Sequence, residues 1–110
     1  MILPGAYGAF NPTPKSIAYG IAKAAVHHLV KSLGEGTGLP ESSIVIGLMP
    51  LVIDTPANRK MMPKADVTNW TSPFEISEKI LEWIQGKSLP KSGSLVKIET
   101  IKGNTSYEYQ

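Results

Sequence analysis

Tyr19 and Lys23 are the residues of this sequence whose types and spacing could do chemistry. They stand four positions apart in the stretch YGIAK, and on a helix residues i and i+4 lie on one face. A free phenol has a pKa of about 10, and an ammonium group together with a second positive charge favours its ionised form. Such a tyrosine can exchange a proton with a substrate near neutral pH. Taken alone, the pentapeptide is more often an ordinary helix in which a half-buried tyrosine and a surface lysine share a face.

The elements that must position this pair begin with a helix predicted over Thr13 to Leu33. Pro14 falls in its first turn, and Gly34, in the stretch GEGTG, is expected to end it. The stretch from Ser42 to Pro50 is apolar and shows no polar alternation. That pattern predicts a strand that is covered on both faces, as in a parallel sheet.

A second helix is predicted after Ser72, which fits the N-cap position. Pro73 fits the first helical position, Glu75 completes an S-x-x-E capping box, and Gly86 is expected to stop the helix. The residues expected to form its buried stripe are Ile76, Ile80, Trp83 and Ile84. The segment from Ser92 to Ile101 is then predicted as another strand.

The order of these elements predicts a right-handed α/β unit on a parallel sheet. The first residues, ILPGA, resemble the end of a further strand. The expected fold class is therefore α/β, the C-terminal portion of a doubly wound Rossmann-type parallel sheet, with residues 1–110 as a single partial domain. The N-terminal dinucleotide-binding half would lie upstream of Met1, because no G-x-G-x-x-G follows a strand in this sequence.

The composition argues against several classes of protein. Of the 110 residues, 42% are hydrophobic and 18% charged, which is typical of a soluble globular domain. The net charge is +2 and the basic residues are scattered, so neither a nucleic acid nor a membrane surface is expected as a partner. The sequence has no cysteine and no apolar run long enough to cross a bilayer, and a cytoplasmic location is expected.

The order of four sequence features resembles that of the short-chain dehydrogenase/reductase family. In that family a strand end, a Y-x-x-x-K helix, a buried strand ending in P-G and a V/I-x-T motif follow one another. The corresponding stretches here are ILPGA, Tyr19 to Lys23, Pro50-Leu51 and Ile53-Asp54-Thr55. The resemblance implies a hydride-transferring enzyme with a nicotinamide cofactor.

Two departures from the family pattern indicate one of its branches. The family usually has a serine thirteen residues before the tyrosine, where this sequence has Ala6, and the P-G glycine is replaced by Leu51. Together with YGIAKAAVHHL, DTPANRKMMPKAD, NWTSPFE and PKSGSLVKI, these departures resemble the quinonoid dihydropteridine reductases over nearly the whole chain. A quinonoid pterin accepts hydride into an electron-poor C=N system, so a single proton donor can suffice where a carbonyl substrate gains from a second hydroxyl.

This resemblance implies roles for individual residues around the cofactor. Tyr19 would be the proton donor, and Lys23 would bind the ribose of the nicotinamide nucleotide. The residues implied to bind the cofactor are Tyr19, Lys23, Pro50, Ile53 and Thr55. The backbone of Ile53 and the hydroxyl of Thr55 would hold its carboxamide. The implied cofactor is NADH, with NADPH left open because that preference is set upstream.

The resemblance also implies a substrate loop and a partner. Asn58, Arg59 and Met62 would lie in a segment that covers the pterin substrate. The helix from Tyr19 to Leu33 would join two copies of the protein into a homodimer, helix against helix. Without the resemblance, the loop residues would be read as an exposed segment with a short helical turn.

The expected function is the NADH-dependent reduction of quinonoid 6,7-dihydropteridine to tetrahydropteridine, which recycles tetrahydrobiopterin. The chain without its cofactor-binding half is expected to be inactive. One alternative is a non-catalytic fragment that dimerises with full-length subunits. The other is a short-chain reductase for another substrate, although Ala6 argues against an ordinary alcohol or ketone.

Four other residues that could have chemical roles are given structural interpretations. His27 and His28 lie about 100° apart on a helix and are not expected to share a metal ion. No third ligand is spaced to help them, and no metal is predicted. Asp54 is expected to serve a turn, and Trp70 is expected to be a core residue rather than a cover over the pterin.

Overall fold

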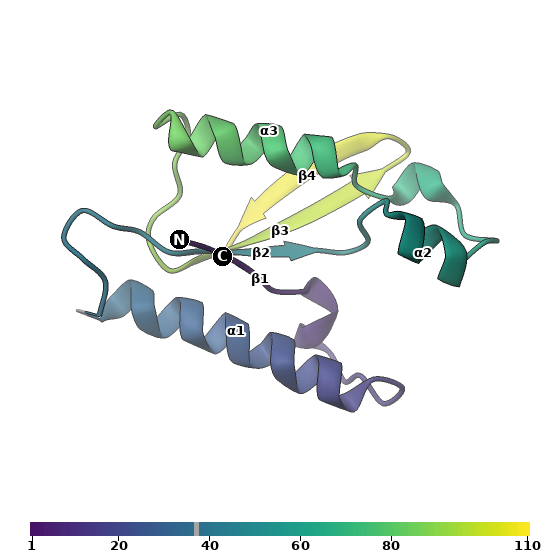
Figure 1. Cartoon of the computed structure of the whole chain (residues 1–110), viewed down its shortest axis with the longest axis horizontal. Coiled ribbons are helices and arrows are strands. Elements are labelled where there is room, and N and C mark those ends of the chain that lie inside the picture. The colour runs from purple at the N-terminus through teal and green to yellow at the C-terminus, as the bar shows by residue number, and fades with distance from the viewer. Residues whose placement is uncertain (37) are drawn as a thin grey trace.

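Four strands form one sheet in the order β1-β2-β3-β4 (Figure 1). They are β1 (Ile2–Pro4), β2 (Ile46–Pro50), β3 (Ser94–Ile101) and β4 (Asn104–Tyr109). The first three are parallel, and β4 runs antiparallel to β3. The computed structural model describes residues 1–36 and 38–110. The predicted α/β class with a mostly parallel sheet is therefore confirmed, and β4 makes the sheet mixed.

Two long helices cover the sheet from opposite sides. These are α1 (Ile17–Glu35), which joins β1 to β2, and α3 (Pro73–Ile84), which leads to β3; Figure 1 shows the sheet between them. A short helix, α2 (Pro56–Met61), and two 3₁₀ turns, η1 (Tyr7–Phe10) and η2 (Val67–Asn69), lie in the connections. Within residues 1–36 and 38–110, no helix is long and apolar enough to cross a membrane.

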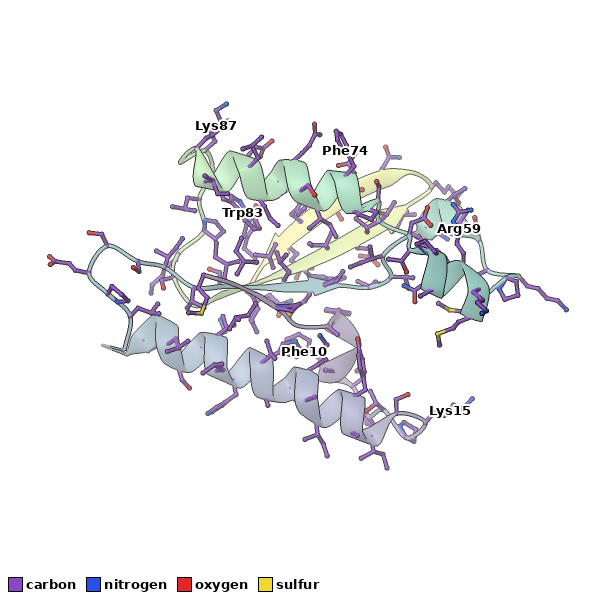
Figure 2. All side chains as sticks on the ribbon, viewed as in Figure 1. Phe10, Lys15, Arg59, Phe74, Trp83 and Lys87 are labelled. Atoms are coloured by element: carbon purple, nitrogen blue, oxygen red, sulfur yellow. The ribbon has the colours of Figure 1, made fainter. Side chains whose placement is uncertain are left out.

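The core is divided into two clusters by the sheet. The buried residues on the α1 side are Val30, Val45, Met49 and Leu95. Those on the α3 side are Ile46, Trp83, Val96 and Ile98, and Figure 2 shows Trp83 pointing from α3 toward the strands. Because successive residues of a strand point to opposite faces, the apolar residues of β2 and β3 contribute to both clusters. This confirms the prediction of a strand covered on both faces.

The two crossover connections have opposite hands. Both advance in the same direction across the sheet, from β1 to β2 and from β2 to β3, so two right-handed crossovers would place both helices on one face. However, α1 packs in one core cluster and α3 in the other. One crossover is therefore left-handed, against the usual hand of about 98% of such connections. The prediction of a right-handed unit is correct for only one of the two.

The helix α1 begins four residues later than predicted and ends two residues later. The N–H of Ser16 donates to the carbonyl of Thr13, which closes a separate turn containing Pro14. Gly34 lies inside the helix, where a Cβ would stand 2.7 Å from the amide nitrogen of Gly93. That glycine allows the helix to approach the loop before β3, and the helix ends at the C-cap Gly36.

The helix α3 has the predicted ends but a narrower buried stripe. Ser72 caps its start by accepting from the N–H of Phe74 rather than from that of Glu75, so the capping-box pattern is replaced by a single cap bond. Gly86 has a φ of +76°, which lets the N–H of Lys87 donate to the carbonyl of Glu82 at 2.8 Å. These bonds end the helix as expected.

The burial of one helix residue and the start of one strand differ from the prediction. Ile84 is 75% exposed, so its expected place in the buried stripe is wrong. Its neighbour Trp83 is the residue of the two that faces the sheet. The strand β2 begins at Ile46 instead of Ser42. Val45, the residue before β2, donates its N–H to the Ser92 hydroxyl at 3.1 Å instead of to the backbone of a neighbouring strand.

Candidate active site

Tyr19 and Lys23 lie on α1, with Lys23 reaching the carboxyl end of β1. The Nζ of Lys23 donates a 2.9 Å hydrogen bond to the carbonyl of Pro4, the last residue of β1. The same Nζ lies 5.8 Å from the centroid of the Tyr19 ring. The Tyr19 side chain is 53% exposed and borders a shallow hollow lined by residues 13–16. The helix thus places an accessible phenol and an ammonium group on one face at the end of a strand.

Pro50, Ile53 and Thr55 follow the carboxyl end of β2, which is the neighbour of β1. Pro50 is the last residue of β2, and Ile53 pairs with Thr71 in an isolated bridge. Thr55 is the N-cap of α2. Because the carboxyl ends of parallel strands open at the same edge of a sheet, both groups of predicted site residues lie at one edge. Ligands of open α/β folds bind at this edge.

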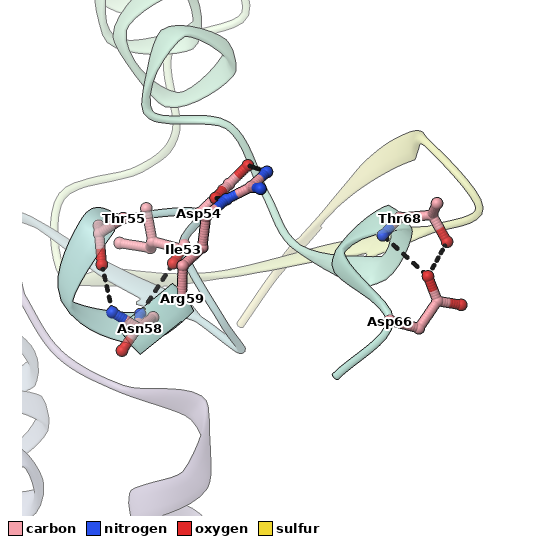
Figure 3. Close-up of polar contacts among 7 residues, drawn as sticks. All are labelled: Ile53, Asp54, Thr55, Asn58, Arg59, Asp66 and Thr68. Atoms are coloured by element: carbon pink, nitrogen blue, oxygen red, sulfur yellow. Dashed lines mark hydrogen bonds and ion pairs between the residues drawn. The ribbon is translucent and has the colours of Figure 1, made fainter. Parts of the chain in front are cut away.

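Asn58 donates hydrogen bonds to the Ile53 carbonyl and to the Thr55 hydroxyl, the two groups that the resemblance assigns to the carboxamide (Figure 3). Its backbone N–H donates to the Thr55 hydroxyl at 3.1 Å, and its Nδ2 donates to the Ile53 carbonyl at 2.8 Å. The carbonyl retains a second lone pair, and the hydroxyl retains its proton for donation. One residue therefore holds both groups in place and leaves each with hydrogen-bonding capacity.

Asp54, just before α2, and Arg59 of α2 form a bidentate ion pair. Arg59 Nε lies 2.6 Å from one carboxylate oxygen of Asp54, and its Nη2 lies 2.9 Å from the other (Figure 3). The hydrogen bonds from this guanidinium lower the pKa of Asp54 below its ordinary value. Asp54 therefore anchors α2 by an ion pair, which extends the turn role expected for it.

The predicted substrate-loop residues lie on or just after α2, which projects beyond the end of the sheet (Figure 1). Arg59 is exposed, and Met62 is the C-cap, whose N–H donates to the Asn58 carbonyl at 2.9 Å. The sequence expectation of an exposed segment with a short helical turn agrees with this structure. The residues follow the carboxyl end of β2, and the side chains of Arg59 and Met62 are exposed.

His27 is a site residue that the sequence interpretation missed. It is 6% exposed, and its Nε2 accepts the backbone N–H of Ala6 at 3.1 Å. The available signal was its spacing: His27 follows Lys23 by four residues and Tyr19 by eight, which places all three on one helical face. The interpretation instead treated His27 with its neighbour His28, which is exposed.

Metal-binding side chains do not gather in this region. Among residues 1–36 and 38–110, no three His, Cys, Asp or Glu side chains lie close enough to hold a metal ion.

Trp70 is buried, as expected of a core residue. It also lines a groove of about 510 Å³ bounded by Thr68, Glu75, Thr100 and Lys102, and none of the predicted site residues borders that groove.

The fold and the sheet edge define an α/β protein with a partial Rossmann-like arrangement. No family model matches the chain. A curated relative, the dihydropteridine reductase of Dictyostelium discoideum, is 48% identical over 101 residues. These residues are 90% of this chain and 44% of the relative, so the chain spans less than half of the relative's length. This similarity confirms the predicted resemblance to the dihydropteridine reductases.

Proposed function

We propose that this chain supplies the proton donor and the nicotinamide-facing side of a dihydropteridine reductase. The reaction is the NADH-dependent reduction of quinonoid 6,7-dihydropteridine to tetrahydropteridine. The observation that carries the proposal is the position of Tyr19 and Lys23 at the strand ends of a chain that is 48% identical to a protein named dihydropteridine reductase. The bound NADH would supply the hydride. The chain's own residues would bind and orient the cofactor and the pterin, and would protonate the pterin.

The residues present fit the nicotinamide half of such a cofactor. A carboxamide needs an acceptor for its NH₂ group and a donor for its oxygen. The Ile53 carbonyl and the Thr55 hydroxyl supply these, and Asn58 keeps them in position. Lys23 uses one of its three N–H donors on Pro4 and retains two for ribose hydroxyls. The remainder of the cofactor lies outside what these residues can hold.

Tyr19 is the proposed proton donor because its phenol is accessible and lies beside Lys23. The ammonium group of Lys23 favours transfer of the phenol proton, since it stabilises the phenolate left behind. Ala6 has no hydroxyl to assist at the strand end, so the proton route depends on Tyr19 alone. A pterin whose C=N bond accepts hydride and one proton matches this arrangement better than a ketone does.

Arg59 and Met62 are proposed to contact the pterin, and α2 would act as the substrate loop. Arg59 is tied to Asp54 by an exposed ion pair, which is weak and can be exchanged for a substrate group. Met62 offers a flexible apolar side chain for a planar ring.

A homodimer through α1 is part of the proposal. Ile17 and Ile21 on this helix are 65% and 66% exposed, and Leu29 is also exposed. Exposed apolar side chains on one helix are typical of an interface. They equally support the alternative, a non-catalytic chain that pairs with longer subunits through α1. Turnover distinguishes the two.

The test is a reductase assay with NADH and a quinonoid dihydropterin. It compares wild type with Tyr19→Phe, each joined to the part of the Dictyostelium discoideum relative that this chain does not cover, because the chain by itself is expected to be inactive. Loss of the proton donor is expected to lower kcat about 100-fold or more, with little change in thermal stability because the phenol is exposed. Tyr109→Phe, which removes an exposed phenol from β4, is the matched control and is expected to retain wild-type kcat.

Three outcomes would contradict the proposal in different ways. Equal kcat in Tyr19→Phe and wild type would remove Tyr19 from the reaction. No turnover by the joined wild-type protein, with turnover appearing only when a longer subunit with its own intact site is added, would favour the non-catalytic alternative. Turnover of a ketone or alcohol in preference to the pterin would favour a short-chain reductase for another substrate.

A further inference from the structure

His27 and Lys23 hold the backbone at the end of β1 from the same face of α1. Lys23 Nζ donates to the Pro4 carbonyl at 2.9 Å, and His27 Nε2 accepts from the Ala6 N–H at 3.1 Å. The side chains are four residues apart on the helix, and the backbone groups are two residues apart on the chain. One face of α1 thus holds Pro4 and Ala6, on either side of Gly5, where β1 leaves the sheet.

The strand end depends on His27 because the sheet's hydrogen bonds stop there. The Gly5 N–H still donates to the Leu48 carbonyl of β2 at 2.7 Å. Ala6 is the next residue, it is buried, and its N–H goes to His27. A buried N–H without a partner is costly, so this imidazole satisfies a group that the sheet does not.

The packing around the imidazole leaves it little freedom to move. A Cβ on Gly5 would stand 2.5 Å from His27 Nε2, so the backbone touches the ring edge closely. Phe10 of η1 stacks on the ring with centroids 4.8 Å apart and planes 27° apart, and Figure 2 shows Phe10 between η1 and α1. The ring is therefore held between the turn after β1 and the strand end itself.

An accepting Nε2 requires the imidazole to be neutral, with its proton on Nδ1. Burial and the charge of Lys23, in that order, lower the pKa of His27. Of the other elements packed here, β1 and β2 have no ionisable side chains, and η1 contributes Tyr7. Lys97 of β3 lies 4.5 Å from the Tyr7 ring and is itself paired with Glu99 of β3 at 3.0 Å and with Glu108 of β4 at 3.9 Å.

We infer that His27 is a positioning residue: by accepting the Ala6 N–H it fixes the end of β1 against the Tyr19 and Lys23 face of α1. The inference rests on the proposed function, since it concerns the site at which Tyr19 would deliver its proton. Ala6 provides no side-chain donor, so the shape of the site at this point is set by backbone. The imidazole determines where that backbone lies relative to Lys23.

The experiment follows the Ala6 amide by NMR in wild type, His27→Gln, His27→Leu and the control Glu35→Gln at the exposed end of α1. In His27→Leu the acceptor is gone, and exchange of the Ala6 amide is expected to be about tenfold faster or more, while the Val96 amide at the sheet centre stays protected. His27→Gln retains an acceptor oxygen and is expected to restore part of the protection. Unchanged exchange in His27→Leu would overturn the inference.

Reductase kinetics supply the second readout. In His27→Leu, kcat is expected to fall about tenfold or more with the KM for the pterin little changed, and His27→Gln is expected to recover part of the loss. A faster-exchanging Ala6 amide with wild-type kcat would also overturn the positioning role. If the wild-type protein joined to the remaining part of the relative shows no turnover while the Ala6 amide still depends on His27, the proposed function fails and the hydrogen bond stands.

A pH titration of wild type keeps the inference testable if His27→Leu does not fold. The Ala6 amide resonance is expected to move as pH falls below about 6.5, when the imidazole becomes protonated and can no longer accept. The same resonance in His27→Gln is expected to be flat over that range. A flat wild-type titration down to the onset of acid unfolding would count against the inference.

Discussion

The ends of β1 and β2 lie at the same edge of the sheet, but they are held in different ways. At the end of β1, side chains of α1 bind backbone groups 19 and 21 residues away, and Ala6 and His27 are buried there. After β2, the hydrogen bonds of Asn58 and Arg59 reach only three to five residues, and the segment around α2 is largely exposed. We call these the fixed half and the adjustable half of the site.

The difference assigns separate tasks to the two halves. The proposed proton donor must keep its distance from the reacting atoms within a fraction of an ångström, which suits the place of Tyr19 on a long helix tied to the core. The proposed substrate loop must open and close, and such segments are drawn from regions with few buried contacts. Substitutions of buried residues in the fixed half should therefore cost stability, and those in the adjustable half should mainly change binding.

Gly5→Ala is expected to have the largest effect on stability. The added methyl group would meet His27 Nε2 at 2.5 Å in a corner that cannot expand, and we expect a loss of about 1–3 kcal/mol in the free energy of unfolding. Gly8→Ala is the matched control, because a Cβ there meets nothing within 4 Å. Equal denaturation midpoints for the two variants would show that the corner is not rigid and would break the comparison.

Asn58→Ala tests the adjustable half at its most connected residue. It removes the Nδ2 bond to the Ile53 carbonyl and keeps the backbone bond to Thr55. We expect the Kd for NADH to rise about tenfold and stability to fall by about 1 kcal/mol or less. Fluorescence titration and thermal unfolding measure the two. A loss of stability as large as that of Gly5→Ala, with unchanged NADH binding, would reverse the assignment of the halves.

Asp54→Asn is expected to have the smallest effect on stability. The ion pair with Arg59 is exposed, so its removal should leave the melting temperature at neutral pH nearly unchanged. Because Arg59 lowers the pKa of Asp54, any contribution is present above the ordinary aspartate pKa near 4 and is lost as pH falls through the lowered value. The melting temperatures of wild type and variant should therefore differ little at pH 7, and any difference between them should vanish toward pH 3. A large difference at pH 7 would mean that α2 is held rigidly.

Much of the fold follows from local sequence signals. The uniformly apolar run before Pro50 predicts a doubly covered strand, and Ser72 with Gly86 predicts both ends of α3. The start of α1 does not follow, because the Thr13 carbonyl is used by a separate turn, as only the folded backbone reveals. The hand of the crossovers depends on which face each helix covers, and a strand that is apolar on both faces carries no information on that choice.

The site follows from sequence only in part. The spacing of Tyr19 and Lys23 predicts that they share a face, and that is where they lie. The acceptor role of His27 depends on a backbone N–H 21 residues away, and nothing local to the histidine indicates it. The same holds for Gly34, whose close approach to Gly93 makes it a packing residue inside the helix it was expected to end.

The central claim is that the two strand ends together form the nicotinamide side of a reductase. The most direct test is an NMR titration of the labelled protein with reduced nicotinamide mononucleotide, the part of the cofactor that these residues would hold. If the nicotinamide binds between the two strand ends, we expect amide shifts at Ile53 and Thr55 in the adjustable half and at Ala6 and Lys23 in the fixed half. Shifts confined to the groove beside Trp70, or no shifts at either strand end at saturating ligand, would contradict it.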